Sequence, residues 1–144
     1  MRLPASVGWM AVVDLGELKG RGGTFSFRPS GERAIGARPG EVLEITLRYD
    51  WKEGSARREA GLVMLTVEGP GGFRDTVRVR LRDRPIVEDQ QSGVLRCRVS
   101  APGRPLALTF TVEALYRETS WVGLGAEPVR EFREKGSVRL APLP

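Results

Sequence analysis

Polar and apolar residues alternate along much of this chain, and the alternation predicts β-strands. In residues 41–51 the apolar Leu43, Ile45 and Leu47 share one parity, and mostly polar residues occupy the positions between them. Successive side chains of a strand point to opposite sides, whereas a helix would scatter these apolar residues around its circumference. The segment is therefore predicted to be a strand with one buried face.

The same test predicts further strands along the chain. They cover residues 9–15, 25–27, 62–67, 73–82, 95–99 and 106–114, with shorter ones at 120–124 and 137–140. Residues 62–67 are almost wholly apolar, which favours a central strand covered on both faces. Turns rich in glycine and proline separate the strands. The longer polar connection at 83–93 is expected to cross between sheets.

Eight or nine short strands with almost no helix predict an all-β fold, a two-layer antiparallel β-sandwich of the immunoglobulin-like or jelly-roll kind. At most one short helix is expected, near residues 128–135, because Pro128 suits a first helical position and Gly136 suits a cap. The length of 144 residues favours one domain. We expect this domain to span 9–140, between a flexible N-terminal arm at 1–8 and a proline-rich tail at 141–144.

The residue types that the chain lacks exclude many mechanisms. It has no histidine and one cysteine, Cys97. Ser–His–Asp and Cys–His mechanisms are therefore excluded, as are zinc sites built on histidine or paired cysteines. Cys97 lies in an alternating run, so we interpret it as a small buried hydrophobe. A carboxylate pair for glycoside hydrolysis is the remaining catalytic alternative, but no pair stands out. We expect no enzyme activity, no cofactor and no metal.

No segment is apolar for long enough to cross a membrane as a helix, and no secretory signal peptide is visible at the start. We therefore expect a reducing location, in the cytoplasm or in a virion. The absence of asparagine and the 10 prolines favour a thermophilic source. The excess of arginine over lysine fits such a source, and it fits a GC-rich genome equally well.

Arginines on one side of two predicted strands are the most distinctive candidates for binding, in a chain of net charge +5. They are Arg74, Arg78, Arg80 and Arg82 on the first strand, and Arg96 and Arg98 on the second. If the two strands paired, six guanidinium groups would share a surface that attracts phosphates and whose binding weakens with salt. The alternative is a solvated outer face whose arginines are neutralised by acidic neighbours. A third interpretation is a protein interface, where arginine forms bidentate pairs with carboxylates.

Aromatic side chains offer a second candidate, a stacking surface for sugars or bases. Trp51 and Tyr49 share the parity of the buried positions, and Trp9 matches Ala11 in the same way, so we interpret all three aromatic residues as core. Trp121 lies in weaker patterning, and it is predicted to be the exposed aromatic contact.

These observations predict a non-enzymatic structural or interaction module, an oligomeric accessory component of a larger protein assembly. A virion shell or decoration component is one such setting, by analogy only. The alternatives are an anion- or nucleic-acid-binding module that uses the arginine-rich face, and a carbohydrate-binding sandwich that uses Trp121. The expected partner is another protein or a second copy of the chain, with nucleic acid as the alternative and no membrane association.

Overall fold

The computed structural model describes residues 11–21, 24–31, 34–52, 58–81, 90–101, 103–119 and 129–142. Nine strands build this part of the chain. They are β1 (Ala11–Arg21), β2 (Thr24–Pro29), β3 (Ala34–Ala37), β4 (Val42–Lys52), β5 (Arg58–Glu68), β6 (Arg74–Leu81), β7 (Gln90–Ser100), β8 (Leu106–Thr119) and β9 (Val129–Pro142). A short 3-10 turn, η2 (Pro70–Gly72), joins β5 to β6.

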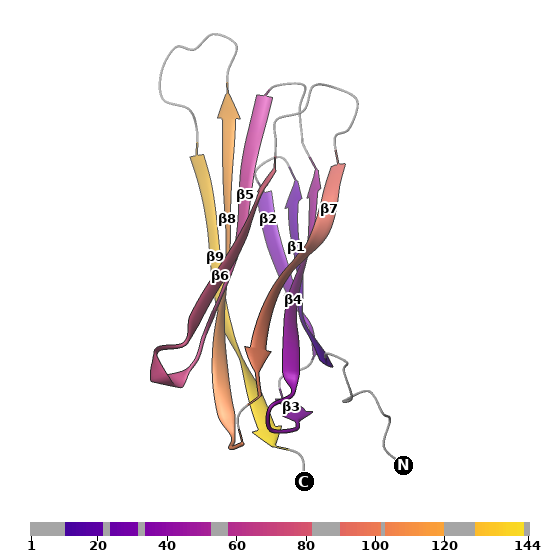
Figure 1. Cartoon of the computed structure of the whole chain (residues 1–144). Helices are drawn as coiled ribbons and strands as arrows, with labels where there is room; N and C mark the ends of the chain where they lie inside the picture. The colour runs from indigo at the N-terminus through magenta and orange to yellow at the C-terminus, as the bar shows by residue number, and fades with distance from the viewer. Residues whose placement is uncertain are drawn as a thin grey trace.

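The strands form two sheets that pack against each other (Figure 1). Their order is β2-β1-β4-β7 in the four-stranded sheet and β3-β9-β8-β5-β6 in the five-stranded sheet. The prediction of an all-β sandwich is thereby confirmed. The sheets are mixed, not purely antiparallel as expected, because β1 runs parallel to β4 and β3 runs parallel to β9. The chain passes repeatedly from one sheet to the other. A strand that comes back to the first sheet can therefore pair with an earlier strand in parallel as well as antiparallel orientation.

The core lies between the sheets and is built from alternate residues, as the sequence predicts. Leu43, Ile45 and Leu47 on β4 are at most 2% exposed. Val63 and Leu65 on β5 contribute from the other sheet and are fully buried. Each such side chain stabilises the fold by about 1.5–3 kcal/mol relative to full exposure.

A β-bulge extends β1 beyond its predicted end. The pairing of β1 with β4 shifts register between Asp14 and Gly16, so Leu15 is an extra residue on β1. Leu15 is buried, and beyond the bulge the buried positions change parity, so that Leu18 also faces the core. The backbone N–H of Gly16 donates a hydrogen bond to Oδ1 of Asp14 over 3.1 Å, which holds the bulge. The break in alternation at Gly16 therefore marks a bulge and not a strand end.

Replacing Gly16 by alanine is expected to lower the free energy of unfolding by about 1–3 kcal/mol. Gly16 has φ +132, and a Cβ there would collide with the backbone oxygen of Arg28 on β2. Gly40→Ala is the matched control, because Gly40 also has a positive φ (+80) but has nothing within 4 Å of a new Cβ. Urea unfolding of both variants separates the collision from the backbone strain. Equal losses at the two sites would contradict this account of the bulge.

Strand β9 occupies the segment for which a short helix is expected near 128–135. From Val129 onward the chain is extended and pairs antiparallel with β8. The helix prediction is therefore wrong for residues 129–135, while Pro128 lies outside the described residues. Gly136 is not a helix cap, because it lies opposite Phe110, whose ring occupies the space that a Cβ would need. The glycine thus serves close packing between two strands.

The last residues of β9 include part of the predicted tail. Ala141 and Pro142 pair with β3 and so belong to the five-stranded sheet. Proline lacks a backbone donor, and it is tolerated here because it ends the strand. The predicted arm at 1–8, and residues 143–144, lie outside the described residues.

Candidate functional site

The candidate arginines do not share one surface. Arg74, Arg78 and Arg80 lie on β6, and Arg96 and Arg98 lie on β7. These strands are consecutive in the chain, yet they are edge strands of different sheets, so the connection between them crosses between layers as predicted. The five side chains are exposed on the two outer faces of the sandwich, which point away from each other. Arg82 lies outside the described residues.

Arg96 and Arg98 are partly neutralised by one carboxylate of the neighbouring strand β4. Nε of Arg96 lies 3.2 Å from Oε1 of Glu44, and Nε of Arg98 lies 3.8 Å from Oε2. Exposed ion pairs of this kind contribute little to stability, but they lower the local positive potential. On β7, the interpretation of a solvated face with acidic neighbours therefore fits the geometry better than a phosphate site does.

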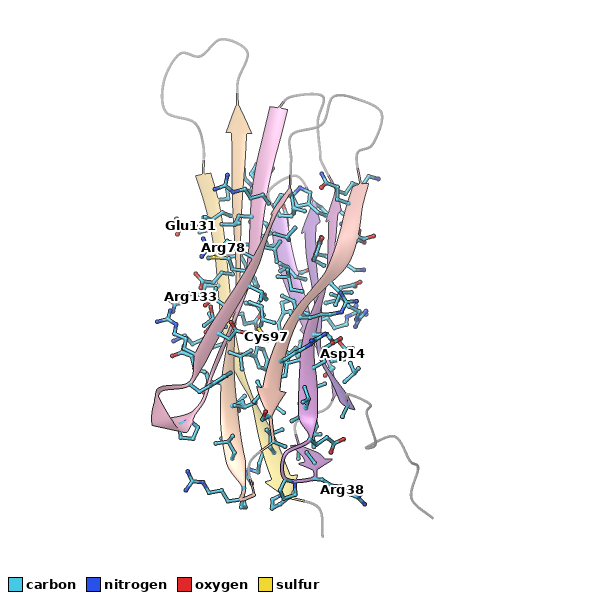
Figure 2. All side chains as sticks on the ribbon, viewed as in Figure 1. Asp14, Arg38, Arg78, Cys97, Glu131 and Arg133 are labelled. Carbon is cyan, nitrogen blue, oxygen red and sulfur yellow. The ribbon has the colours of Figure 1, made fainter. Side chains whose placement is uncertain are left out.

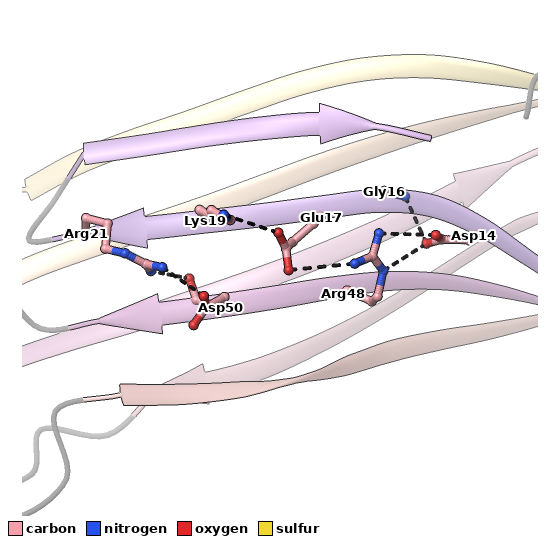
Figure 3. Close-up of polar contacts among 7 residues, drawn as sticks. All are labelled: Asp14, Gly16, Glu17, Lys19, Arg21, Arg48 and Asp50. Carbon is pink, nitrogen blue, oxygen red and sulfur yellow. Dashed lines mark hydrogen bonds and ion pairs between the residues drawn. The ribbon is translucent and has the colours of Figure 1, made fainter. Parts of the chain in front are cut away.

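The rest of this face carries further ion pairs (Figure 3). Nη2 of Arg48 lies 3.2 Å from Oδ2 of Asp14, and Nη1 of Arg48 lies 3.7 Å from Oε2 of Glu17. Nη2 of Arg21 lies 2.8 Å from Oδ2 of Asp50. The outer face of the four-stranded sheet is thus occupied by contacts within the chain.

The outer face of the five-stranded sheet combines exposed arginine with apolar side chains. Arg80 lies beside Leu62, which lies beside Leu115, and Arg78 lies beside Met64 in the next row of the same face. The three apolar side chains are half-buried. The prediction that residues 62–67 are covered on both faces is wrong for Leu62 and Met64, because in the described part of the chain no third layer covers this sheet. We call these five residues the arginine–aliphatic patch.

The arginines of the arginine–aliphatic patch have no ion pair with any described residue. Figure 2 shows the labelled Arg78 on the side of the five-stranded sheet, with Asp14 on the opposite side of the sandwich. Next to the patch, the hydroxyls of Thr66 and Thr76 lie 3.1 Å apart and satisfy each other. The described part of the chain therefore leaves the guanidinium groups of Arg78 and Arg80 free to bind carboxylates or phosphates.

Cys97 lies where β6 and β7 approach each other, and it is buried as the sequence predicts. Burial raises the pKa of its thiol from 9.0 to about 12, and the charge of Asp75, together with its hydrogen bond to the thiol, adds to this effect. The thiolate is the nucleophilic form, so Cys97 is unreactive at neutral pH. Asp75 points inward from an edge strand, which also discourages the pairing of another chain with β6.

Two hollows of the described surface flank β2. One of about 150 Å³ is lined by Leu15, Phe27 and Phe110 among others, and a second of about 280 Å³ lies over Lys19 and Arg28. Within the described ranges, no group of three or more acidic or cysteine side chains is placed to hold a metal ion. The hollow beside Phe27 is about large enough for one apolar side chain.

The aromatic residues of the described part are mostly internal. Trp51 is 3% exposed and packs against Phe25 and Tyr116, with ring centroids 5.7 and 6.1 Å away, so its prediction as core is confirmed. Tyr49 is half-buried. Trp9 and Trp121 lie outside the described residues, so the predicted aromatic contact at Trp121 stays a prediction.

Sequence reasoning found Arg78 and Arg80 but missed their apolar neighbours. The signal was present, because Leu62 and Met64 lie in a run that is apolar at both parities. Such a run fits a doubly covered strand as well as a strand with an apolar outer surface. Sheet order decides between them, and it is not readable from periodicity.

Among the described residues there is no helix of the length and apolar character that crossing a membrane requires. Comparisons with models of protein families, with curated proteins and with solved structures find no match to this chain.

Proposed function

We propose that this protein is a non-enzymatic interaction module, a structural component of a larger protein assembly, and that it binds an acidic surface of a partner protein through the arginine–aliphatic patch. One observation carries the proposal. The two outer faces of the sandwich differ, because the face of β1 and β4 is held by ion pairs within the chain, while Arg78 and Arg80 on β6 form none with the residues that the structure describes.

The chemistry of the patch suits a protein partner. Arginine and methionine are enriched at protein interfaces, and a guanidinium binds a carboxylate through two parallel hydrogen bonds. Leu62 and Leu115 would lie under such a contact and exclude water from it. The partner is therefore expected to present carboxylates around an apolar centre.

Nucleic acid fits this face less well. Glu113 and Glu131 lie on the same face and interrupt its positive charge, to which Arg133 and Lys135 of β9 also contribute. No strand residue described on this face is aromatic, so it offers no stacking platform for bases. The split of the arginines between two faces also removes the continuous basic surface on which the nucleic-acid alternative depends.

The wider setting belongs to the proposal as well. A shell or decoration component of a virion is one assembly of this kind, and a thermophilic source fits the absence of asparagine. A reducing compartment fits the buried free thiol of Cys97.

The test compares two matched double variants as baits in an extract of the source organism, treated with nuclease. Arg78→Ser/Arg80→Ser removes the two patch arginines, and Arg96→Ser/Arg98→Ser removes the same charge from the other face. We expect wild type and Arg96→Ser/Arg98→Ser, the β7 variant, to capture the same protein. We expect Arg78→Ser/Arg80→Ser, the β6 variant, not to capture it. Mass spectrometry identifies the captured protein, and circular dichroism confirms that each variant is folded.

Two results would count against the proposal. Identical capture by all three baits would show that the patch is not the binding surface. Salt-dependent binding to a 20-base-pair duplex DNA that the β6 variant loses would favour the nucleic-acid alternative.

A further inference from the structure

Strand β9 has an edge that the described strands leave mostly unpaired. On one side it pairs with β8 from Val129 to Leu140, whereas on the other side β3 pairs only with Arg139–Pro142. Along 130–138, no described residue pairs with the second side of β9. An edge of this kind presents backbone N–H and C=O groups that can pair with another strand.

The side chains along this open edge follow a reversing charge pattern. The run is Arg130, Glu131, Phe132, Arg133 and Glu134. Residues at equal distances on the two sides of Phe132 carry opposite charges: Glu131 matches Arg133, and Arg130 matches Glu134. The four charged side chains are exposed, and none forms an ion pair with a described residue. Figure 2 shows Glu131 and Arg133 at the margin of the sandwich.

We propose that a second copy of this chain pairs along the open edge, antiparallel, with a two-fold axis at Phe132. Directly opposite residues of an antiparallel pair share a face and lie about 4.5–5.5 Å apart at Cβ. In this register Glu131 of each copy lies opposite Arg133 of the other, and Arg130 lies opposite Glu134. All four charged pairs are attractive, and the two five-stranded sheets become one continuous sheet.

The neighbouring registers that keep the two sheets continuous lack this match. A shift by two residues in one direction places the Arg133 side chains of the two copies opposite each other. A shift in the other direction places the two Glu131 side chains opposite each other, so like charges meet in both cases. A two-fold contact must be self-complementary, so the charge pattern selects one register.

The other edges of the sandwich are poorer candidates. On their outer faces β6 and β7 carry arginines and no acidic side chain, so two copies would repel each other along either strand. Strand β2 is six residues long and ends in Pro29, and the edge strand β3 is only four residues long. Among the described edges, β9 therefore fits a second copy best.

Phe132 lies at the centre of the proposed contact. It is half-buried, and its ring centroid lies 5.9 Å from that of Phe25 on β2. Strands β2 and β9 thus lie at the same side of the sandwich, as the pale yellow β9 behind β2 in Figure 3 shows. The two arginines of the arginine–aliphatic patch are remote from the proposed contact in sheet order, because β6 is at the opposite edge of the five-stranded sheet, whereas Leu115 of the patch lies on β8 opposite Glu131. The inference rests on the proposed function, since it names the contact through which an assembling module would associate with itself.

Charge reversal tests the register directly by sedimentation velocity. Wild type is expected to show twice the mass of one chain. Glu131→Arg or Arg133→Glu alone converts two attractive pairs into two repulsive ones, so each variant is expected to dimerise about tenfold or more weakly. When these two variants are mixed, every opposite pair is again attractive, and the dimer mass is expected to return.

Arg104→Glu is the matched control, because it makes the same charge change in an exposed turn, and it should leave the mass unchanged. A wild-type chain that is monomeric at about 100 µM would overturn the inference. A mixture of the two variants that stays monomeric would overturn it as well. A wild-type dimer that survives both single reversals would also overturn it while leaving the proposed module intact. Loss of partner capture by Arg78→Ser/Arg80→Ser does not depend on β9, so it tests the proposed function separately.

Discussion

Replacing Trp51 by alanine is expected to lower the free energy of unfolding by about 3–5 kcal/mol. The indole ring is 3% exposed and fills the space between the two sheets. It packs closely on two glycines, because a Cβ at Gly20 of β1 would lie 2.7 Å from its Cε3 and a Cβ at Gly61 of β5 would lie 2.5 Å from its Cζ2. Alanine would leave a cavity that these strands cannot close without losing their pairing.

Urea unfolding measures this loss, with Val12→Ala as the control, because Val12 is 60% exposed. Gly61→Ala adds a second arm, since its new Cβ would collide with the ring and is expected to destabilise the wild type by about 1–3 kcal/mol. In the Trp51→Ala background the same methyl enters empty space, so its cost should fall sharply. A loss at Trp51 no larger than at Val12, or equal costs of Gly61→Ala in both backgrounds, would contradict the packing described here.

Raising the pH above 9 is expected to destabilise the wild type more steeply than Cys97→Ala. Burial and the neighbouring Asp75 raise the pKa of the Cys97 thiol from 9.0 to about 12. The unfolded chain therefore releases this proton near pH 9, whereas the folded chain keeps it until about pH 12. The stabilisation from the protonated thiol is complete below pH 9 and is lost as the pH rises from 9 to 12. The difference in slope is expected to be about 1.4 kcal/mol per pH unit within this window.

Urea unfolding at several pH values from 8 to 10.5, under reducing conditions, gives the slope for both proteins. Asp75→Asn keeps the side-chain size and removes the charge that adds to the raised pKa, so its slope is expected to level off at a lower pH than that of wild type. Parallel curves for wild type and Cys97→Ala would show that the thiol ionises equally easily in both states.

The sequence correctly predicts which side chains of a strand are buried where only one face of that strand is covered. Leu43, Ile45, Leu47 and Trp51 alternate with polar residues, and the structure buries all four. The rule holds as far as Leu15, which is buried, and fails beyond it, because a bulge inserts one residue and reverses the parity of the buried positions. A local pattern does not distinguish such an insertion from the end of a strand.

The helix expected near 128–135 shows a second limit. The spacing of Val129 and Phe132 and a glycine after Lys135 suit a helix end, whereas Phe132, Gly136 and Val138 also keep the parity of a strand. Pairing with β8 along its whole length decides for the strand, and such a long-range contact is not visible in the local sequence.

The candidate site was predictable in its residues but not in its arrangement. Alternation placed Arg78, Arg80, Arg96 and Arg98 on outer faces, which the structure confirms. Their division between two sheets depends on a crossing connection, and the neutralisation by Glu44 depends on the register between β4 and β7. Neither follows from the order of residues along one strand.

Arginine-selective labelling with phenylglyoxal tests the central claim, that the protein binds its partner through the outer face of the five-stranded sheet. Arg78 and Arg80 report on that face, and Arg98, whose side chain is 67% exposed on the other face, is the internal reference. Adding the captured partner is expected to reduce the labelling of Arg78 and Arg80 and to leave that of Arg98 unchanged. Protection of Arg98 with undiminished labelling of Arg78 and Arg80 would contradict the account.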